Sequence, residues 1–241
     1  MPARQSPPLA EAPFDADGND DLTEPEDLTA PEDLTAMDGR RLGRRAQETR
    51  RKLLDATADL IATKGLLDLT VVEIARRVGT SPASFYQYFQ NVEEAVLALS
   101  EVIGGELEAL VPLVDAPWRG RQGFESCREL VRRFIDHWDE NRAVLRVRDL
   151  SAQEGDRRFR DVRNASLSLI TDRLTAKIAE FQAAGKVPPE MTPYAAASAM
   201  VAMMGRMAAY HSDLETRGFT RDDMVETVAR IVYQTVTGRR P

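Results

Sequence analysis

The chain has 241 residues, 43% of them hydrophobic, which is enough apolar material for one or two buried cores. A single cysteine, Cys127, excludes an internal disulfide framework and fits a reducing compartment. There is no N-terminal apolar run, and the most hydrophobic stretch, Tyr194 to Met204, is far shorter than the ~20 residues that cross a bilayer. We therefore expect a soluble, cytoplasmic protein.

The net charge of −7 is unevenly distributed along the chain. Residues 1–38 hold eleven Asp or Glu and one Arg, whereas residues 39–90 hold ten Lys or Arg and five Asp or Glu. Attraction to phosphate depends on the local charge of a surface rather than on the net charge of the chain. Residues 39–90 are therefore the segment in which we expect nucleic-acid binding.

Residues 1–39 are predicted to be a disordered acidic tail. They are rich in Pro, Asp, Glu and Ala, and they repeat the hexapeptide PEDLTA at 25–30 and 31–36. Such a composition buries too little apolar area to offset the entropy lost on ordering. The tail would serve as a spacer, or its isolated leucines would touch a partner. A further hypothesis is that its negative charge competes with DNA for the basic segment.

A first helix is predicted over residues 44–63, because apolar residues recur on one face and Gly65 follows as a stop signal. Four arginines precede or open this helix: Arg40, Arg41, Arg44 and Arg45. Arginines in this position can bind phosphates or enter a minor groove. The alternative is a solvated basic run.

Residues 70–89 carry the signals of two short helices joined by a tight turn. Thr70 and Glu73 have the spacing of a capping box, and an apolar stripe with helical spacing follows. Gly79 supplies the positive φ that ends this helix, and Ser81, followed by proline, is suited to the N-cap of the next. The pattern predicts a helix-turn-helix.

The second of these helices has a surface suited to DNA. Phe85 and Phe89, one turn apart, can be buried against the preceding helix. The other positions carry small residues followed by Tyr and Gln, where an ordinary exposed helix has Lys or Glu. That set suits close approach to a groove and its flanking phosphates, and its members are Ala83, Ser84, Tyr86, Gln87 and Tyr88.

This segment, with the helix on either side, resembles the DNA-binding domain of TetR-type (tetracycline-repressor family) regulators over about residues 44–105. The family pattern is T-x-x-x-I-A-x-x-x-G-x-S-x-x-[ST]-[FL]-Y-x-[YH]-F, followed by a lysine-led helix. The matching positions are Thr70, Ile74, Ala75, Gly79, Ser81, Ser84, Phe85, Tyr86, Tyr88 and Phe89. Val92 stands where most members carry the lysine, so one phosphate contact of the family is expected to be absent.

The resemblance implies a role for each surface residue. Ala83, Ser84 and Gln87 are expected to face base edges in the major groove, with Ala83 and the preceding proline suited to thymine methyl groups. Other members of the set would hold phosphates or position the domain. The predicted DNA-binding residues are Arg44, Arg45, Thr70, Ser81, Pro82, Ala83, Ser84, Tyr86, Gln87 and Tyr88.

The rest of the chain is predicted to be helical throughout. A capping box at Asn91 and Glu94 opens a helix that runs to about Val111, where Pro112 is expected to end it. Later helices are predicted over 120–141, 142–151, 159–185, 192–214 and 220–238, with Thr192 and Thr220 as caps of the last two. The fold class is therefore all-α, with a three-helix helix-turn-helix domain over residues 40–90 and a C-terminal helical domain over residues 91–241.

The last two predicted helices carry more apolar surface than one core covers. The resemblance implies that this helix pair forms a homodimer by packing against its symmetry mate as a four-helix bundle. A two-fold dimer places two reading heads about 34–36 Å apart, which requires a palindromic operator.

No set of residues typical of an enzyme is present: there is no Gly-rich phosphate loop, no G-x-S-x-G and no H-E-x-x-H. The two histidines fall on separate helices, and one cysteine cannot complete a thiolate zinc site. Metal binding by His211 with Asp213, or by His137 with Asp136 and Asp139, is the alternative to ordinary satisfied or surface residues. We expect no catalytic activity, no metal and no cofactor.

A ligand site is expected in the C-terminal helices. In TetR-type regulators these helices enclose a mostly apolar pocket, and an effector bound there lowers operator affinity, so the resemblance implies a ligand-released repressor. Methionine-rich walls adapt to varied apolar shapes, which favours a hydrophobic effector. The candidate wall residues, each of which could equally be plain core, are Phe134, His137, Trp138, Leu167, Ile170, Met203, Met204, Met207 and Tyr210.

Three other interpretations remain open. The first is a structural helix-turn-helix inside an unrelated helical protein, and the second is a helical carrier whose DNA reader is vestigial. The third is a protein that coats DNA without regard to sequence, which competition with random DNA would reveal.

Overall fold

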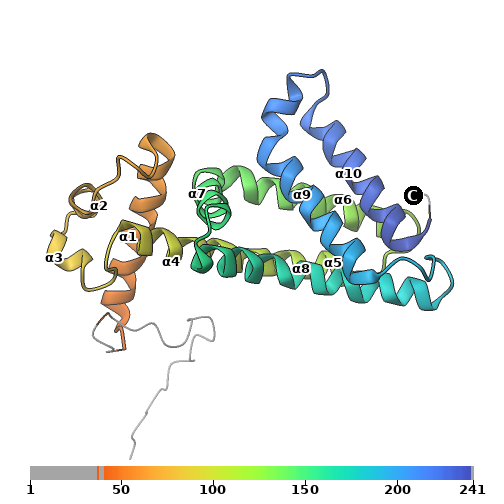
Figure 1. The fold of residues 1–241 in the computed structure, drawn as a ribbon, viewed down its shortest axis with the longest axis horizontal. Coiled ribbons are helices and arrows are strands. Elements are labelled where there is room, and N and C mark those ends of the chain that lie inside the picture. The colour runs from red at the N-terminus through yellow and green to blue at the C-terminus, as the bar shows by residue number, and fades with distance from the viewer. Residues whose placement is uncertain (1–36, 38–40, 240–241) are drawn as a thin grey trace, which may run out of the picture. The chain divides into compact units, whose positions relative to one another are not determined.

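A computed structural model of the chain describes residue 37 and residues 41–239. Except for Met37, the predicted acidic tail lies outside the described residues. Within them the structure is all-α, as predicted, with no extended strand (Figure 1). The elements are α1 (Arg44–Lys64), α2 (Val71–Val78), α3 (Pro82–Phe85), α4 (Val92–Gly105), the 3₁₀ helix η1 (Glu106–Leu110), α5 (Val111–Asp115), α6 (Gly120–Glu140), α7 (Arg142–Gln153), α8 (Arg157–Ala183), α9 (Pro193–Glu215) and α10 (Arg221–Thr237).

The first four helices pack around a shared apolar core. Helix α1 contacts α2 and α4, and α2 contacts α3. Leu53, Ile74 and Phe85, one from each of the first three helices, have no exposed surface. Burial of apolar side chains is therefore what fixes the angle at which α3 leaves α2.

Helix α4 joins these helices to the remainder of the chain, since it packs against α1 on one side and against α7 and α8 on another. Its glycine Gly104 permits a close approach to α8. A Cβ at this position would overlap the side chain of Ser166. The adjacent Gly105 has open space around it.

The segment after α4 differs from the prediction. Helix α4 ends at Gly105, a 3₁₀ helix follows, and Pro112 lies inside α5 instead of ending a helix. Proline is tolerated in the first turn of a helix because the N–H it lacks has no intrahelical partner there. Pro112 therefore lies in the first turn of α5, which follows the 3₁₀ helix directly.

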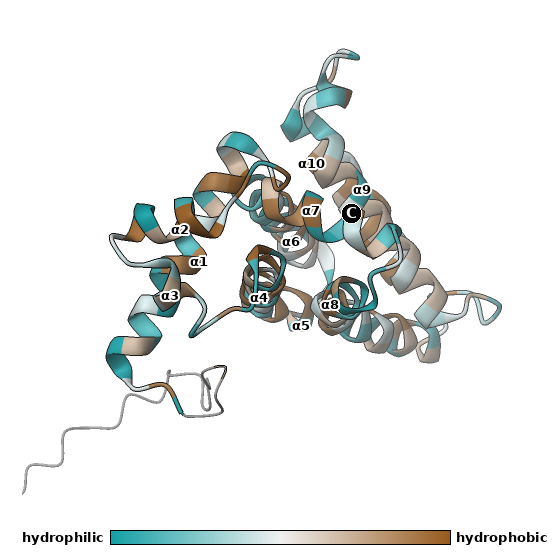
Figure 2. Cartoon of the chain, turned by 60° about the vertical axis from the view of Figure 1, so that its left-hand side comes forward, coloured by the Kyte–Doolittle hydropathy of each residue, from teal (hydrophilic) through white to brown (hydrophobic). Residues whose placement is uncertain are grey.

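The C-terminal helices form the larger part of the hydrophobic core. Helix α8 packs against α4, α7 and α9, and α10 packs against α6 and α9. Figure 2 shows hydrophobic and hydrophilic residues in alternation along these helices. Cys127 belongs to this core: burial raises the pKa of its thiol, and its Sγ lies 3.4 Å from the carbonyl oxygen of Ala229. Among the described residues no helix is both long and apolar enough for a membrane crossing.

The predicted helix caps are partly confirmed. Thr220 and Asp223 form a complete capping box, and Gly238 follows α10 in the left-handed region. The cap at Thr192 is wrong in detail, because its side chain makes no capping hydrogen bond. At Asn91 only half of the box forms: its side chain accepts the N–H of Glu94, whose own carboxylate accepts the N–H of Gln90 instead.

Candidate nucleic-acid interface and effector cavity

The start of α2 is fixed by a capping box that also reaches α1. The Thr70 hydroxyl accepts the N–H of Glu73 at 3.3 Å, and the Glu73 carboxylate accepts the N–H of Thr70 at 3.2 Å. Lys64, the last residue of α1, forms an ion pair with the same carboxylate. Hydrogen bonds from Lys64 and Thr70 lower the pKa of Glu73, so this carboxylate stays charged and holds the two helix ends together.

A tight turn then presents α3. Gly79 has φ of 74° and ψ of 31°, the left-handed conformation that glycine adopts without a Cβ clash. Ser81 caps α3 by accepting the N–H of Ser84 at 3.2 Å, and proline occupies the first turn. The helix is only four residues long, and 3₁₀-type turns carry the backbone on from Phe85 to Phe89.

The two faces of this segment differ in burial as the sequence predicts. Phe85 and Phe89 are buried, and their rings pack 5.4 Å apart. The side chain of Tyr86 is 52% exposed. Ser81, Pro82, Ala83 and Gln87 are exposed, whereas Ser84 and Tyr88 are half-buried. We call the exposed and half-buried residues of 81–88 the reading surface.

The beginning of the described chain lies beside the reading surface. The main-chain N–H of Met37 donates to the carbonyl oxygen of Gln87 at 3.1 Å. The guanidinium of Arg50, on α1, stacks 5.3 Å from the centre of the Phe89 ring. Arg44 and Arg45 are exposed in the first turn of α1, six and five residues before Arg50. Arg50 thus brings one basic side chain of α1 to the end of the segment that carries the reading surface.

The start of α4, where Val92 stands, has an arginine nearby. Val92 is half-buried and forms part of the apolar packing. The next residue, Glu93, accepts a hydrogen bond of 2.8 Å from Arg158 of α8. Arg158 is also paired with Asp156, the N-cap residue of α8. Two carboxylates thus compensate its charge.

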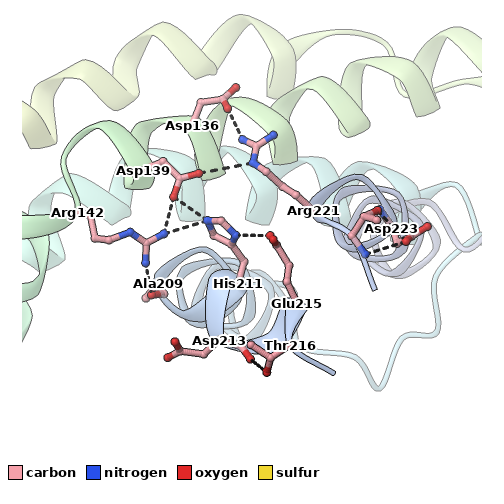
Figure 3. Close-up of polar contacts among 11 residues, drawn as sticks. Asp136, Asp139, Arg142, Ala209, His211, Asp213, Glu215, Thr216, Arg221 and Asp223 are labelled. Carbon is pink, nitrogen blue, oxygen red and sulfur yellow. Dashed lines mark hydrogen bonds and ion pairs between the residues drawn. The ribbon is translucent and has the colours of Figure 1, made fainter. Parts of the chain in front are cut away.

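A polar cluster holds α6, α7, α9 and α10 together (Figure 3). At its centre His211 of α9 lies between Asp139 of α6, 2.7 Å from Nε2, and Glu215, 2.8 Å from Nδ1. Arg142, the first residue of α7, donates to Asp139, and Arg221 of α10 pairs with Asp139 and Asp136. The alternative prediction paired His211 with Asp213, and the structure does not bring these two side chains together. The carboxylate partners of His211 are Glu215, one turn along α9, and Asp139 on α6.

No group of three or more metal-ligating side chains with suitable geometry occurs in residue 37 or residues 41–239. His137 instead lies 3.4 Å, through Nδ1, from the carboxylate of Glu106, and its buried Nε2 has no hydrogen-bond partner in the described part of the chain. Burial, and then the nearby charge of Arg148, lowers the pKa of His137 to about 4. The ring is therefore neutral near pH 7.

A cavity of about 560 Å³ lies where α6, α7, α8 and α9 meet. Of the nine predicted wall residues, Trp138, Leu167 and Tyr210 line it. Phe134, Ile170 and Met204 are instead buried in the core, and Met203 and Met207 are partly buried against it. The arginines of the lining are not among the predicted wall residues, because charged residues on a helix ordinarily indicate a solvated face.

The geometry defines a class of protein: an all-helical chain with a helix-turn-helix whose second helix has an exposed reading surface. Comparison with known families agrees. Residues 53–99 match the family "Bacterial regulatory proteins, tetR family", and residues 109–241 match the family "Tetracyclin repressor-like, C-terminal domain". The chain belongs to the TetR family of DNA-binding transcriptional regulators, which are not enzymes.

Curated relatives resemble the chain over a short region. The HTH-type transcriptional regulator BetI of Brucella suis biovar 1 is 38% identical over 72 residues, which cover 28% of this chain and 36% of BetI. BetI of Brucella anthropi is 36% identical over 72 residues, 28% of this chain and 37% of the relative. The match thus spans little more than a third of these relatives' length.

Solved structures share the fold over most of the chain. NalD, the secondary repressor of the MexAB-OprM multidrug efflux pump in Pseudomonas aeruginosa, superposes with a TM-score of 0.58 at 22% identity, covering 79% of this chain and 97% of NalD. The SmeT–triclosan complex, of the Stenotrophomonas maltophilia repressor, gives 0.59 at 19% identity, covering 77% and 90%. At these identities the likeness concerns the fold alone.

Proposed function

We propose that the chain is a homodimeric, sequence-specific repressor that binds a palindromic operator and is released from it by a small effector. The observation that carries the proposal is the reading surface, in which two buried phenylalanines hold a short helix so that Ala83, Tyr86 and Gln87 are exposed. A helix with a purely structural role would pack these positions against the rest of the protein. An exposed helix N-terminus with small side chains can enter a major groove.

Each part of the interface has a separate role in this proposal. Ala83, Ser84 and Gln87 read base edges, and Tyr86 and Tyr88 contact flanking phosphates. Arg44, Arg45 and Thr70 position the domain on the sugar–phosphate backbone. Ser81 supports these contacts by capping α3, which keeps the backbone N–H groups of its first turn ordered.

Dimerisation through α9 and α10 is supported by what these helices expose. Ala195 and Ala199, four residues apart on α9, are exposed. Small side chains on one face allow two helices to approach closely. On α10 the side chain of Ile231 is 43% exposed. A second copy packed on this face would bury these apolar groups and set the distance between the two reading surfaces.

Effector release is supported by the cavity among α6, α7, α8 and α9. Its volume lies in the range of about 300–1,000 Å³ that small-molecule sites usually have. The rings of Trp138 and Tyr210 give it apolar walls. For release to occur, the effector has to bind the DNA-free conformation more tightly than the operator-bound one.

Footprinting on the DNA that flanks its own gene tests the proposal. We expect protection of a two-fold symmetric site that survives an excess of random DNA at ~150 mM salt. Equal competition by random DNA would indicate a coating protein instead. No binding to any flanking DNA would favour a helical carrier with a vestigial reader.

A further inference from the structure

The effector cavity has an unbalanced charge. Four arginines but only one carboxylate belong to its lining: Arg146, Arg148, Arg163, Arg206 and Asp149. They come from α7, α8 and α9, so three separate helices bring positive charge to one cavity. The remaining lining is largely apolar and includes Trp138, Leu167 and Tyr210.

Arg148 is the buried member of this group, with 3% of its surface exposed. Its Nε donates to Asp149 at 2.9 Å. Burial lowers the pKa of Arg148 and the charge of Arg163 lowers it further, against the opposing effect of Asp149. A buried cation is costly unless opposite charge and hydrogen bonds satisfy it, and a single carboxylate uses only part of the five N–H donors of a guanidinium.

The other three arginines form no ion pair with a carboxylate in the described part of the chain. Arg163 donates only to the amide oxygen of its neighbour Asn164, at 3.5 Å. Arg206 stacks on the ring of Tyr210, 3.7 Å from its centre, and this contact leaves its N–H groups free to donate. Arg146 forms no ion pair within residues 41–239. Several guanidinium groups around this cavity therefore lack a carboxylate partner.

We propose that the effector is an organic anion, a carboxylate carried on an apolar body. Arginine forks bind carboxylates through paired hydrogen bonds, and Arg148 and Arg163 are placed to hold the charged end. The apolar body would lie against Trp138 and Tyr210. This inference rests on the proposed function, since it assigns the cavity to the effector. It restricts the expected class of effector from largely apolar molecules to amphiphilic acids.

The inference is tested on the full chain with a series of ω-phenyl carboxylates, from phenylacetate to 8-phenyloctanoate. Each acid is compared with the alcohol and the amine that carry the same body, by calorimetry and by quenching of tryptophan fluorescence. We expect an acid to bind at least about tenfold more tightly than its alcohol, because charged hydrogen bonds contribute most to such a difference. The amine should bind least.

Two matched variants of α8 locate the charge. Arg163→Gln, at a half-buried cavity position, should weaken binding of the acid by about tenfold and leave the alcohol unchanged. Arg160→Gln, equally half-buried on the same helix but outside the lining, should change neither affinity. Arg148→Met should weaken binding of the acid further. If the Arg148→Met protein fails to fold, the result for Arg163→Gln still tests the inference.

Three results would overturn the inference: equal affinity for acid and alcohol, tighter binding of the amine, or no binding of any acid in the millimolar range. Each would leave a sequence-specific regulator intact. Conversely, an acid that binds through Arg163 without releasing the operator would uphold the anionic site and contradict effector release. The two proposals can therefore fail separately.

Discussion

Arg142 at the start of α7 donates a hydrogen bond of 2.7 Å from Nη1 to the main-chain oxygen of Ala209 on α9. Its other terminal nitrogen, Nη2, lies against Asp139 and 2.9 Å from Nε2 of His211. One side chain thus connects the α6–α7 junction with the helix that carries the proposed dimer face. Any movement of α7 against α9 has to break this set of contacts.

Replacing Arg142 by Met should destabilise the fold by about 1–3 kcal/mol, because it removes a charged donor from the part-buried Asp139 carboxylate and the hydrogen bond that ties α7 to the Ala209 carbonyl oxygen. Chemical denaturation measures the change. Arg146→Met, one turn later on the same helix and exposed, is the matched control and should fall within about 0.5 kcal/mol of wild type. Equal effects of the two substitutions would refute a specific role for Arg142.

The contact between α4 and α8 gives a second stability prediction. Gly104→Ala should destabilise by about 1–3 kcal/mol, since the new Cβ would lie within 2.9 Å of the Ser166 Cβ and force the helices apart. Gly105→Ala adds the same methyl group in open space at the last residue of α4, where the backbone is helical, and should be neutral or stabilising by about 0.5–1 kcal/mol. Thermal unfolding of both variants compares them directly. A stable Gly104→Ala protein would mean that α4 and α8 pack more loosely than described.

The features that the sequence predicts are local ones. The capping boxes at Thr70 and Thr220 depend on residues three apart, and the positive φ at Gly79 depends on glycine itself. Such signals are visible in a single stretch of sequence because the interacting groups are chain neighbours. The burial of Phe85 and Phe89 follows in the same way from helical spacing.

The features that the sequence does not predict join distant residues. The hydrogen bond from Arg142 to Ala209 spans 67 positions, and the pairing of His211 with Asp139 spans 72. The burial of Arg148 is a further case, because an arginine followed by an aspartate on a helix resembles a solvated position until the neighbouring helices are placed. These contacts depend on tertiary packing alone. For the same reason, the positive charge of the cavity lining could not be predicted from the sequence.

Acid should destabilise the protein partly through His137. Its folded pKa of about 4 lies below the ordinary value of 6.5, so on acidification the unfolded chain binds a proton before the folded chain does. The stability that this neutral ring contributes is fully present above about pH 6.5 and is lost as the pH falls toward 4. His137→Asn, which keeps a donor but does not titrate, should remove about 1–2 kcal/mol of that pH dependence. Denaturation at several pH values measures it, and parallel curves for the two proteins would contradict the prediction.

Two further variants should distinguish contacts that read the DNA sequence from contacts that bind any DNA. Gln87→Ala should cost about 1–3 kcal/mol at one base position of the operator and relax the preference there, because an exposed amide reads base edges by paired hydrogen bonds. Arg45→Ala should weaken binding to all sequences alike and flatten the slope of log affinity against log salt by about one unit. Arg128→Ala, remote from the interface on α6, should change neither quantity. Binding to a library of operators at several salt concentrations separates the effects, and an unaltered base preference in Gln87→Ala would show that Gln87 does not read a base.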